Sequence, residues 1–503
     1  MRGNPFIPII LGYRILIIGY VLFYYIFTPG LSIILHGSVS PLPGWRYTAE
    51  IAYAFLLLLP ILFYRSSYGW LHPLIFPAIF GIATGIVRNP QLLLEPFLVF
   101  SEQHGGEIHH VALWSWSQEA IAWAALKAKI ISMVALSVYY FGFFFGPQPS
   151  IPYLVFTKPR NIIPKVLTVV ALSAVVFLIY IHFKGGLTAH ISSWGQGRFI
   201  ALAGEGPVMV LIECGMVASL IWFALDRTAS RNPLFWIVLL FVVPVNFFTG
   251  GSRSSVILAV VFFLMILMIR HQKIPKVKII AIAVAAFILV GALGTLRRST
   301  YQGEVDWTVL TDFNFKESIE EAREEIEFRE TNNGYLPVIA KVPDKVGLLY
   351  GKSYVGTLLF FIPRALWPDK PRGAGAMNGE IIFEGGAGVP TGPVGEAYWN
   401  FYIPGVVIMF FLYGLFHRWL SRTFAQYSRV PAAWVLYVLT LFTFSPESIS
   451  MVKWFHLMIP AIFILYWMGA LSFNKRKKRR YVPTGAGMKM TSMNPIWGKG
   501  SSP

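Results

Sequence analysis

Cysteine and charged residues are both scarce in this sequence. The single cysteine, Cys214, excludes an intrachain disulfide framework. Asp, Glu, Lys and Arg make up only 13% of the 503 residues, whereas hydrophobic residues make up 55% and the mean hydropathy is +0.60. This is far more apolar surface than a soluble domain of the same length needs. The composition therefore predicts a polytopic membrane protein.

Acidic residues are the scarcer of the two charged types. There are 24 of them against 42 Lys and Arg, which gives a formal net charge of +18. In a soluble chain this excess would favour nucleic acid as a partner. Here much of it lies in short connections between apolar runs and in NKRKKRR at 474–480, the pattern with which cytoplasmic loops hold the orientation of a membrane protein. We therefore expect no nucleic acid partner.

The apolar runs predict an all-α chain with about twelve membrane helices, since a bilayer needs about 20 mostly apolar residues per helix. The runs lie at roughly 6–28, 48–64, 72–88, 119–146, 162–183, 206–225, 233–249, 254–270, 276–295, 395–417, 432–447 and 451–472. The first run has no small-residue cleavage pattern, so we expect it to be retained. The basic tail places the end of the last helix in the cytoplasm, and every short connection then assigned to that side carries Lys or Arg. Both termini are expected to lie in the cytoplasm, and the protein is expected in the inner (cytoplasmic) membrane.

One connection is much longer than two helices require. The predicted organisation is nine membrane helices over 1–295, a large outer loop over 296–394, three membrane helices over 395–473 and a basic cytoplasmic tail over 474–503. Long connections of this kind are usually functional or disordered. Within the loop, residues 314–330 have the spacing of an amphipathic helix, and YVGTLLFFI (354–362) is too short to cross and stops at Pro363. The loop is therefore expected to be a folded, functional segment at the membrane surface.

Several basic residues fall on the predicted outer face, where topology does not require them. These candidate substrate-binding cations are Arg253 in the turn TGGSRSS, Arg297, Arg298, then Arg364, Lys370 and Arg372 in the proline elbow FFIPRALWPDKPRG (360–373), and Lys453, with His456 close by. Guanidinium groups gathered near helix ends and glycine turns suit phosphate oxygens. For Arg298 and Arg372, snorkelling to lipid headgroups is an equal alternative. The pattern predicts a site for a lipid-linked diphosphate.

Acidic candidates on the same face are fewer. GEAYWNF (395–401) brings Glu396 to the outer mouth of the tenth predicted span beside Tyr398 and Asn400, and Glu447 lies at the outer end of the eleventh. A carboxylate at the edge of the hydrocarbon is costly unless it is paired or useful. Glu396 is therefore either a general base that faces a substrate hydroxyl or the partner in a structural salt bridge to one of the arginines.

No metal or other cofactor is expected. His104, Glu107, His109 and His110 match no tight ligand spacing. The first outer connection, 29–47, contains no acid, which argues against the metal-dependent lipid-linked glycosyltransferases that carry an acidic pair there. Serine–histidine nucleophile motifs are absent as well.

Two segments carry a resemblance to a known family. GTLLFFIPRALWPDKPRG (356–373), followed by GPVGEAYWNFYIPG (392–405), resembles the oligosaccharide repeat-unit polymerases of the O-antigen polymerase (Wzy-type) family, and TGGSRSS resembles the Gly-Ser-Arg turn of that family. The resemblance covers a small part of the chain. It implies a GT-C-like membrane glycosyltransferase that works without a metal on the periplasmic or exterior face. Its donor and acceptor would be polyprenyl (undecaprenyl) diphosphate-linked glycans within the membrane lipid, with a flippase and a chain-length regulator as further partners.

The resemblance also suggests roles for the candidates. Arg253 and Arg364, assisted by Arg297 and Lys370, would hold the donor diphosphate and stabilise its growing charge. Glu396 would orient or deprotonate the acceptor hydroxyl, with Tyr398 and Asn400 as sugar-contacting neighbours, and His456 would be a reserve base.

Two other functions stay open. An O-antigen ligase performs the same chemistry on a different acceptor and shares the large outer loop. A twelve-span transporter or lipid-linked oligosaccharide flippase would fit the number of helices. Transporters tend to have related halves, however, whereas here the large loop lies far from the centre of the sequence. The sequence therefore favours the polymerase.

Overall fold

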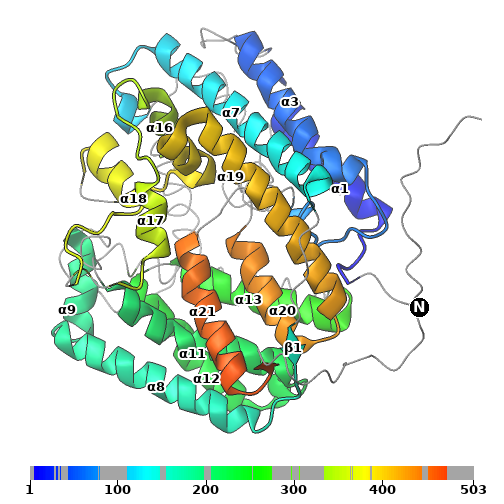
Figure 1. The fold of residues 1–503 in the computed structure, drawn as a ribbon, viewed down its shortest axis with the longest axis vertical. Helices are drawn as coiled ribbons and strands as arrows, with labels where there is room; N and C mark the ends of the chain where they lie inside the picture. The colour runs from blue at the N-terminus through cyan, green and yellow to red at the C-terminus, as the bar shows by residue number, and fades with distance from the viewer. Residues whose placement is uncertain are drawn as a thin grey trace, which may run out of the picture.

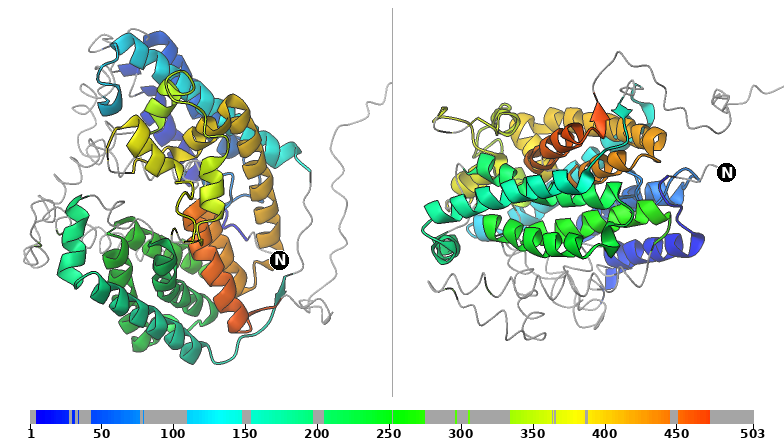
Figure 2. Two further views of the ribbon diagram at one scale, coloured as in Figure 1. Left: turned by 60° about the vertical axis from the view of Figure 1, so that its left-hand side comes forward. Right: turned by 90° about the horizontal axis from the view of Figure 1, so that it is seen from below.

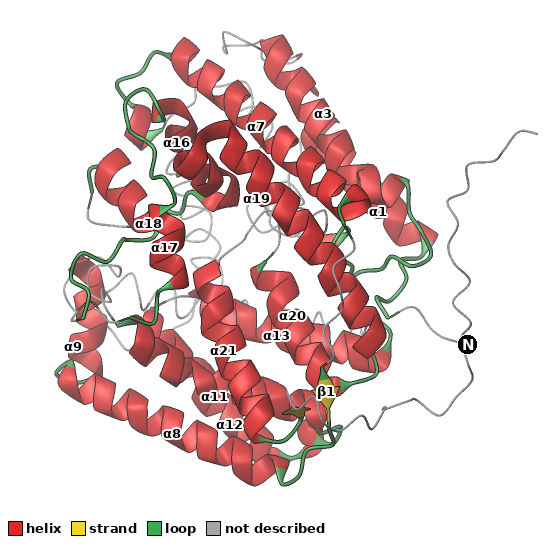
Figure 3. Cartoon of the chain, viewed as in Figure 1, coloured by secondary structure: helices red, strands yellow, loops and turns green. Residues whose placement is uncertain are grey.

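The described part of the protein is mostly helical (Figures 1 and 3). The computed structural model describes residues 5–27, 30–31, 34, 43–76, 79, 110–147, 154–196, 205–251, 253–274, 296, 305, 334–362, 364, 366–385, 388–444 and 451–472. Within these residues the single sheet is a pair of two-residue antiparallel strands, β1 (Val155–Phe156) and β2 (Leu471–Ser472).

Among the residues that the structure describes, ten helices are long. They are α1 (Leu11–Leu22), α3 (Pro43–Leu62), α7 (Gln118–Phe145), α8 (Ile162–Phe183), α11 (Gly206–Leu225), α12 (Pro233–Gly250), α13 (Arg253–His271), α19 (Gly392–Tyr427), α20 (Pro431–Thr443) and α21 (Met451–Trp467). The short helical segments are η1 (Phe23–Phe27), η2 (Val111–Leu113), α9 (Leu187–Ser192), η3 (Ser193–Gln196), η4 (Ala229–Arg231), α16 (Tyr335–Lys341), α17 (Lys352–Leu358), α18 (Ala374–Met377) and η7 (Asn378–Ile382).

Six of the described helices are long and apolar enough to cross a membrane: α3, α7, α8, α11, α12 and α19. The protein is thus a helical membrane protein. The total of twelve spans and the GT-C-like fold stay predictions, because the run 276–295 and most of 72–88 lie outside the described residues. The amphipathic helix expected at 314–330 lies outside them too.

Local sequence signals set the ends of these helices. Ser117 caps α7 by accepting a hydrogen bond from the Ala120 N–H at 3.2 Å, and Asn232 caps α12 by accepting one from the Leu234 N–H at 3.0 Å. Both residue types are favoured at this position because their side-chain oxygens satisfy helix N–H groups that have no partner within the helix. Pro233 then fits the first turn of α12, where no backbone donor is needed.

Helix α19 runs diagonally across the molecule, with α3 and α7 on one side and α20 and α21 on the other (Figure 1). One buried cluster of apolar side chains joins α1, α3, α7, α16 and the first half of α19. A second cluster joins α11, α12, α13, α20, α21 and the last turns of α19. Figure 2 shows the helices of these two clusters at opposite ends of the molecule. Helix α19 therefore connects the two halves of the core.

Helix α19 is broken near its first third. Phe401 has φ −142° and ψ 22°, and Tyr402 has φ 58° and ψ −146°, a combination that residues with a side chain rarely adopt. Pro404 contributes to the break, because it has no N–H to donate to the carbonyl of Asn400 four residues earlier. In lipid every backbone polar group needs a partner within the protein. The break must therefore be covered by another segment.

The segment just before α17 covers this break. The Leu349 N–H donates to the Trp399 carbonyl at 3.0 Å, and the Tyr350 N–H donates to the Asn400 carbonyl at 3.1 Å. The two carbonyls released by the break are thus satisfied, and α17 is anchored against the first half of α19.

Candidate active site

Glu396, Asn400 and Ser353 form a polar cluster between α17 and α19. Ser353 and Asn400 are fully buried. The Ser353 hydroxyl donates to Glu396 Oε1 at 2.7 Å and accepts from Asn400 Nδ2 at 2.8 Å. Asn400 Nδ2 also donates to the Glu396 carbonyl at 2.8 Å, and Asn400 Oδ1 accepts from the Gly351 N–H at 2.9 Å. The hydrogen-bonding groups of Asn400 therefore hold the cluster together.

Glu396 is the only member of this cluster that keeps an available polar atom. Its side chain is partly exposed, and within the described part of the chain no donor reaches its second oxygen, Oε2. A carboxylate held at one oxygen, with no donor from the described residues at the other, has the arrangement that a general base needs.

The neighbouring aromatic residues hold the preceding loop. Tyr398 Oη donates to the Val342 carbonyl at 3.2 Å, and Trp399 Nε1 donates to the Gly347 carbonyl at 3.1 Å. Both side chains are fully buried. The motif that contains Glu396 therefore binds residues 342–353 and holds them in place. This role accounts for the many polar and aromatic positions of the motif.

Tyr354 lies next to this cluster and was not expected from the sequence. Its hydroxyl is buried and has no hydrogen-bond partner among the described residues. Burial raises the pKa of Tyr354 far above its ordinary value, and the neighbouring Tyr413 and Glu396 raise it further. Ser353 was not expected either. It lies 43 positions from Glu396, and no local pattern in the sequence connects the two residues.

The cations of the proline elbow are close together but differ in what they contact. Lys370 Nζ donates to the carbonyls of Phe360 at 2.8 Å and Ile362 at 3.0 Å, so it ties the elbow to itself. Burial lowers the pKa of the Lys370 ammonium, and the charge of Arg364 lowers it further. Arg364 Nη1 donates to the Pro368 carbonyl at 3.3 Å, which uses one of its five N–H groups. Arg372 forms an exposed ion pair with Glu380.

Helix α21 packs against the elbow. The ring of His456 lies 4.8 Å from that of Phe360, measured between centroids. His456 Nε2 is buried without a partner in the described part of the chain. Residues from the elbow and from α21 therefore meet through aromatic contact.

Lys453, on the same helix, forms an ion pair with Glu213 of α11. The exposed fractions of the two side chains are 27% and 14%. Glu213 was missed in the sequence, although a lone acid within an apolar run is a signal that could have identified it. This pair joins α11 to α21 and neutralises Lys453.

The remaining predicted residues are described in part or not at all. Arg253 is the first residue of α13, but its side chain lies outside the described residues, as do Arg297, Arg298 and Glu447. Of the histidine-rich segment only His110 is described, and its Nδ1 accepts from the Ala112 N–H at 3.2 Å as the cap of η2. Among the described residues, no group of three or more His, Cys, Asp or Glu side chains could hold a metal ion.

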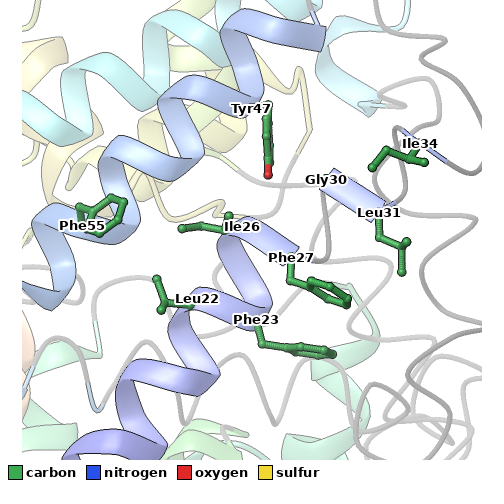
Figure 4. A pocket seen from close by; sticks show the side chains of 9 residues that line it. All are labelled: Leu22, Phe23, Ile26, Phe27, Gly30, Leu31, Ile34, Tyr47 and Phe55. Carbon is green, nitrogen blue, oxygen red and sulfur yellow. The ribbon is translucent and has the colours of Figure 1, made fainter.

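An apolar cavity of about 640 Å³ lies between η1 and α3 (Figure 4). Its walls include Leu22, Phe23, Phe27 and Ile34, and Tyr47 contributes the hydroxyl seen in the figure. None of Ser353, Glu396 or Asn400 lines it, and its described lining residues include no carboxylate and no cation. The cavity therefore suits hydrocarbon.

Comparison with known proteins adds one partial match. A family model described as "Domain of unknown function (DUF8712)" matches residues 208–428, which is less than half of the chain. No curated protein and no solved structure matches the sequence. The matched range contains Arg253, the proline elbow and Glu396, and it ends before Lys453 and His456.

Proposed function

We propose that the protein is an integral membrane glycosyltransferase of the O-antigen polymerase type. It would transfer a glycan as a block from a polyprenyl diphosphate to a sugar hydroxyl of a second lipid-linked repeat unit, on the outer face of the membrane. The observation that carries the proposal is the Glu396 carboxylate. It is held at one oxygen by buried Ser353 and lies on the helix that docks the segment leading into the cation-rich proline elbow.

In the proposed reaction, the acceptor hydroxyl attacks the anomeric carbon of the donor while the bond from that carbon to the diphosphate oxygen breaks. The hydroxyl proton passes to Glu396, and the bonding electrons leave with the diphosphate. Arg253 and Arg364 would stabilise the charge that develops on the diphosphate, an effect worth about 10²- to 10³-fold in rate for a single donor in other enzymes.

Supporting roles follow from the contacts already described. Lys370 binds two carbonyl groups of the elbow. In this proposal it therefore holds Arg364 in position, and its positive charge adds to the attraction for the diphosphate. Asn400 and Tyr398 hold Ser353 and the 342–353 loop and thereby orient Glu396. Binding groups on such fixed supports keep their geometry better than groups on free loops.

The break in α19 can be compared with those of transporters, in which interrupted helices offer free backbone groups to ions and substrates. Here Leu349 and Tyr350 already occupy the carbonyls of Trp399 and Asn400. The break therefore fits a fixed docking role better than an ion-binding role, which favours the enzyme over the transporter.

The test is genetic complementation of a strain that lacks its own copy. We expect Arg253→Ala, Arg364→Ala and Glu396→Gln to leave the amount of membrane protein unchanged while long-chain polysaccharide collapses to single repeat units. Arg231→Ala, an exposed arginine in η4 on the predicted cytoplasmic side, is the matched control and should polymerise normally. Normal chain length in both the Arg253 and Arg364 variants would refute the diphosphate role.

The phenotype of the deletion separates the alternatives. Single-unit caps indicate a polymerase, free lipid-linked polymer indicates a ligase, and lipid-linked units that accumulate in the cytoplasm indicate a flippase. A rate for Glu396→Gln equal to wild type across the pH range would exclude Glu396 as the base.

A further inference from the structure

The turn that precedes Arg253 is built around a glycine in a left-handed conformation. Helix α12 ends at Gly250, and Gly251 follows with φ 59° while its N–H donates to the Phe247 carbonyl at 2.7 Å. A left-handed residue at this position is a common way to end a helix, and glycine adopts it without the steric cost that a Cβ would add. Helix α13 then starts at Arg253, so the backbone conformation of Gly251 determines the position of the Arg253 backbone.

A tryptophan from a distant segment lies directly against this glycine. Trp194 belongs to η3, in the predicted outer connection between α8 and α11, and is 2% exposed. A Cβ added to Gly251 would lie 3.0 to 3.1 Å from three atoms of the indole ring, closer than ordinary van der Waals contact. The ring also meets Phe247 edge-on, with centroids 5.9 Å apart. Trp194 therefore packs directly against the Gly251 backbone.

His190 holds the same turn from the preceding helix. It is 1% exposed, and its Nε2 lies 2.9 Å from the Phe248 carbonyl oxygen. This carbonyl is among the last four of α12, which have no partner within the helix, so His190 donates the hydrogen bond that caps it. The tautomer with the proton on Nε2 follows from this contact.

Apolar packing completes the support. Ile191, Trp194, Phe247 and Val256 form one buried cluster, and Val305 from the predicted outer loop packs against it. The cluster thus joins α9, η3, the end of α12 and the start of α13. Residues 190–194 and Val305, both distant in sequence, therefore pack against the two helix ends that flank the turn.

We infer that Trp194 and His190 are positioning residues that act through Gly251 to set the place of Arg253. The inference rests on the proposed function, since it concerns the arginine that would hold the donor diphosphate. The observations behind the inference are the backbone conformation of the turn and the side chains that pack against the turn. A displacement of about 1 Å at a group that orients a reacting centre can reduce the rate about 100-fold, so a support of this kind has a measurable effect on catalysis.

Two adjacent glycines provide a matched test. A Cβ on Gly250 has no atom within 4 Å, whereas a Cβ on Gly251 meets the Trp194 ring and a left-handed backbone. The substrate is the lipid-linked single repeat unit isolated from the deletion strain, added to the full-length protein in proteoliposomes. We expect Gly250→Ala to match wild type and Gly251→Ala to lower kcat at least about 10-fold, with KM changing less than kcat. The unfolding temperature of Gly251→Ala in detergent should be lower than that of Gly250→Ala, because a Cβ strains the left-handed backbone, so the rates are compared at a temperature at which both variants stay folded.

A double variant tests whether Trp194 is the partner. Trp194→Phe keeps an apolar ring but removes the fused part of the indole, so Gly251→Ala combined with Trp194→Phe should recover part of the lost kcat. Absence of any recovery would overturn the part of the inference that concerns Trp194.

The controls separate this inference from the proposed function. If Arg253→Ala polymerises normally, the proposed role of Arg253 fails regardless of the glycine variants. If Arg253→Ala is inactive and Gly251→Ala behaves like Gly250→Ala, the positioning inference alone is overturned. It is also overturned if Gly251→Ala loses kcat only in proportion to a lower unfolding temperature, because the turn would then have a merely structural role.

Discussion

Removing the Ser353 hydroxyl is the most direct perturbation of the polar cluster. Ser353→Ala deletes one oxygen that donates to Glu396 Oε1 at 2.7 Å and accepts from Asn400 Nδ2 at 2.8 Å. Asn400 retains its bonds to the Glu396 carbonyl and the Gly351 N–H, so the loop that it holds should stay in place. The change therefore acts mainly on the carboxylate of Glu396.

The size of the effect follows from the kind of bond that is lost. A hydrogen bond to a charged group contributes about 1.5–3 kcal/mol. If this free energy serves to orient Glu396 in the transition state, its loss lowers kcat about 10- to 100-fold. The assay is the initial rate of polymerisation of isolated lipid-linked units in proteoliposomes, with the amount of reconstituted protein measured in each sample.

The matched control is another fully buried serine. Ser219 lies in α11, and its hydroxyl donates only within its own helix, to the Gly215 carbonyl at 2.9 Å. Ser219→Ala should therefore leave the rate close to wild type. A Ser353→Ala rate within about twofold of the Ser219→Ala rate, which is less than about 0.5 kcal/mol, would refute the reasoning that Ser353 orients Glu396.

Two further predictions concern stability. Glu213→Gln removes the carboxylate that pairs with Lys453 between α11 and α21. Because both side chains are partly exposed, we expect a loss of at most about 3 kcal/mol, seen as a lower unfolding temperature in detergent and partly restored by the exchange E213K with K453E. Burial lowers the pKa of His190 below 6.5 in the folded protein. The contribution of neutral His190 to the free energy of unfolding is therefore fully present above about pH 6.5, and it is lost as the pH falls through the folded-state pKa. Between about pH 7.5 and pH 5 the unfolding temperature of wild type should fall more than that of His190→Gln, and equal falls would contradict this prediction.

The membrane helices could be predicted from the sequence with good accuracy where local signals coincide. The run 162–183 matches α8 (Ile162–Phe183), and the runs 206–225 and 233–249 match α11 and α12 to within one residue. These helices are mostly apolar and are flanked by proline, asparagine or glycine, so hydropathy and capping agree. Helix α19 extends ten residues past its predicted end at 417, because its last turns leave the apolar run but keep residues with good helix propensity.

The polar cluster could be predicted only in part. Glu396 and Asn400 were identifiable because polar residues at the edge of an apolar run stand out. Ser353 and Tyr354 were not, since their approach to Glu396 depends on the break in α19 and on how residues 349–351 cover it. Pro404 is a visible signal for that break, but the left-handed conformation falls on Tyr402, a residue type that gives no warning of it.

The two parts of the proposed site rest on different buried clusters. Ala397, Tyr398 and Trp399, which surround Glu396 in sequence, belong to the buried cluster of α7 and the first half of α19. The turn before Arg253 rests on a separate small cluster formed by Ile191, Trp194, Phe247 and Val256. Helix α21 contacts the proline elbow through His456 and Phe360, so its position affects the position of the elbow. The ion pair of Lys453 with Glu213 joins α21 to α11. Loss of Glu213 should therefore reduce the rate of transfer by more than its effect on stability alone would explain, because it loosens the helix that contacts the proline elbow.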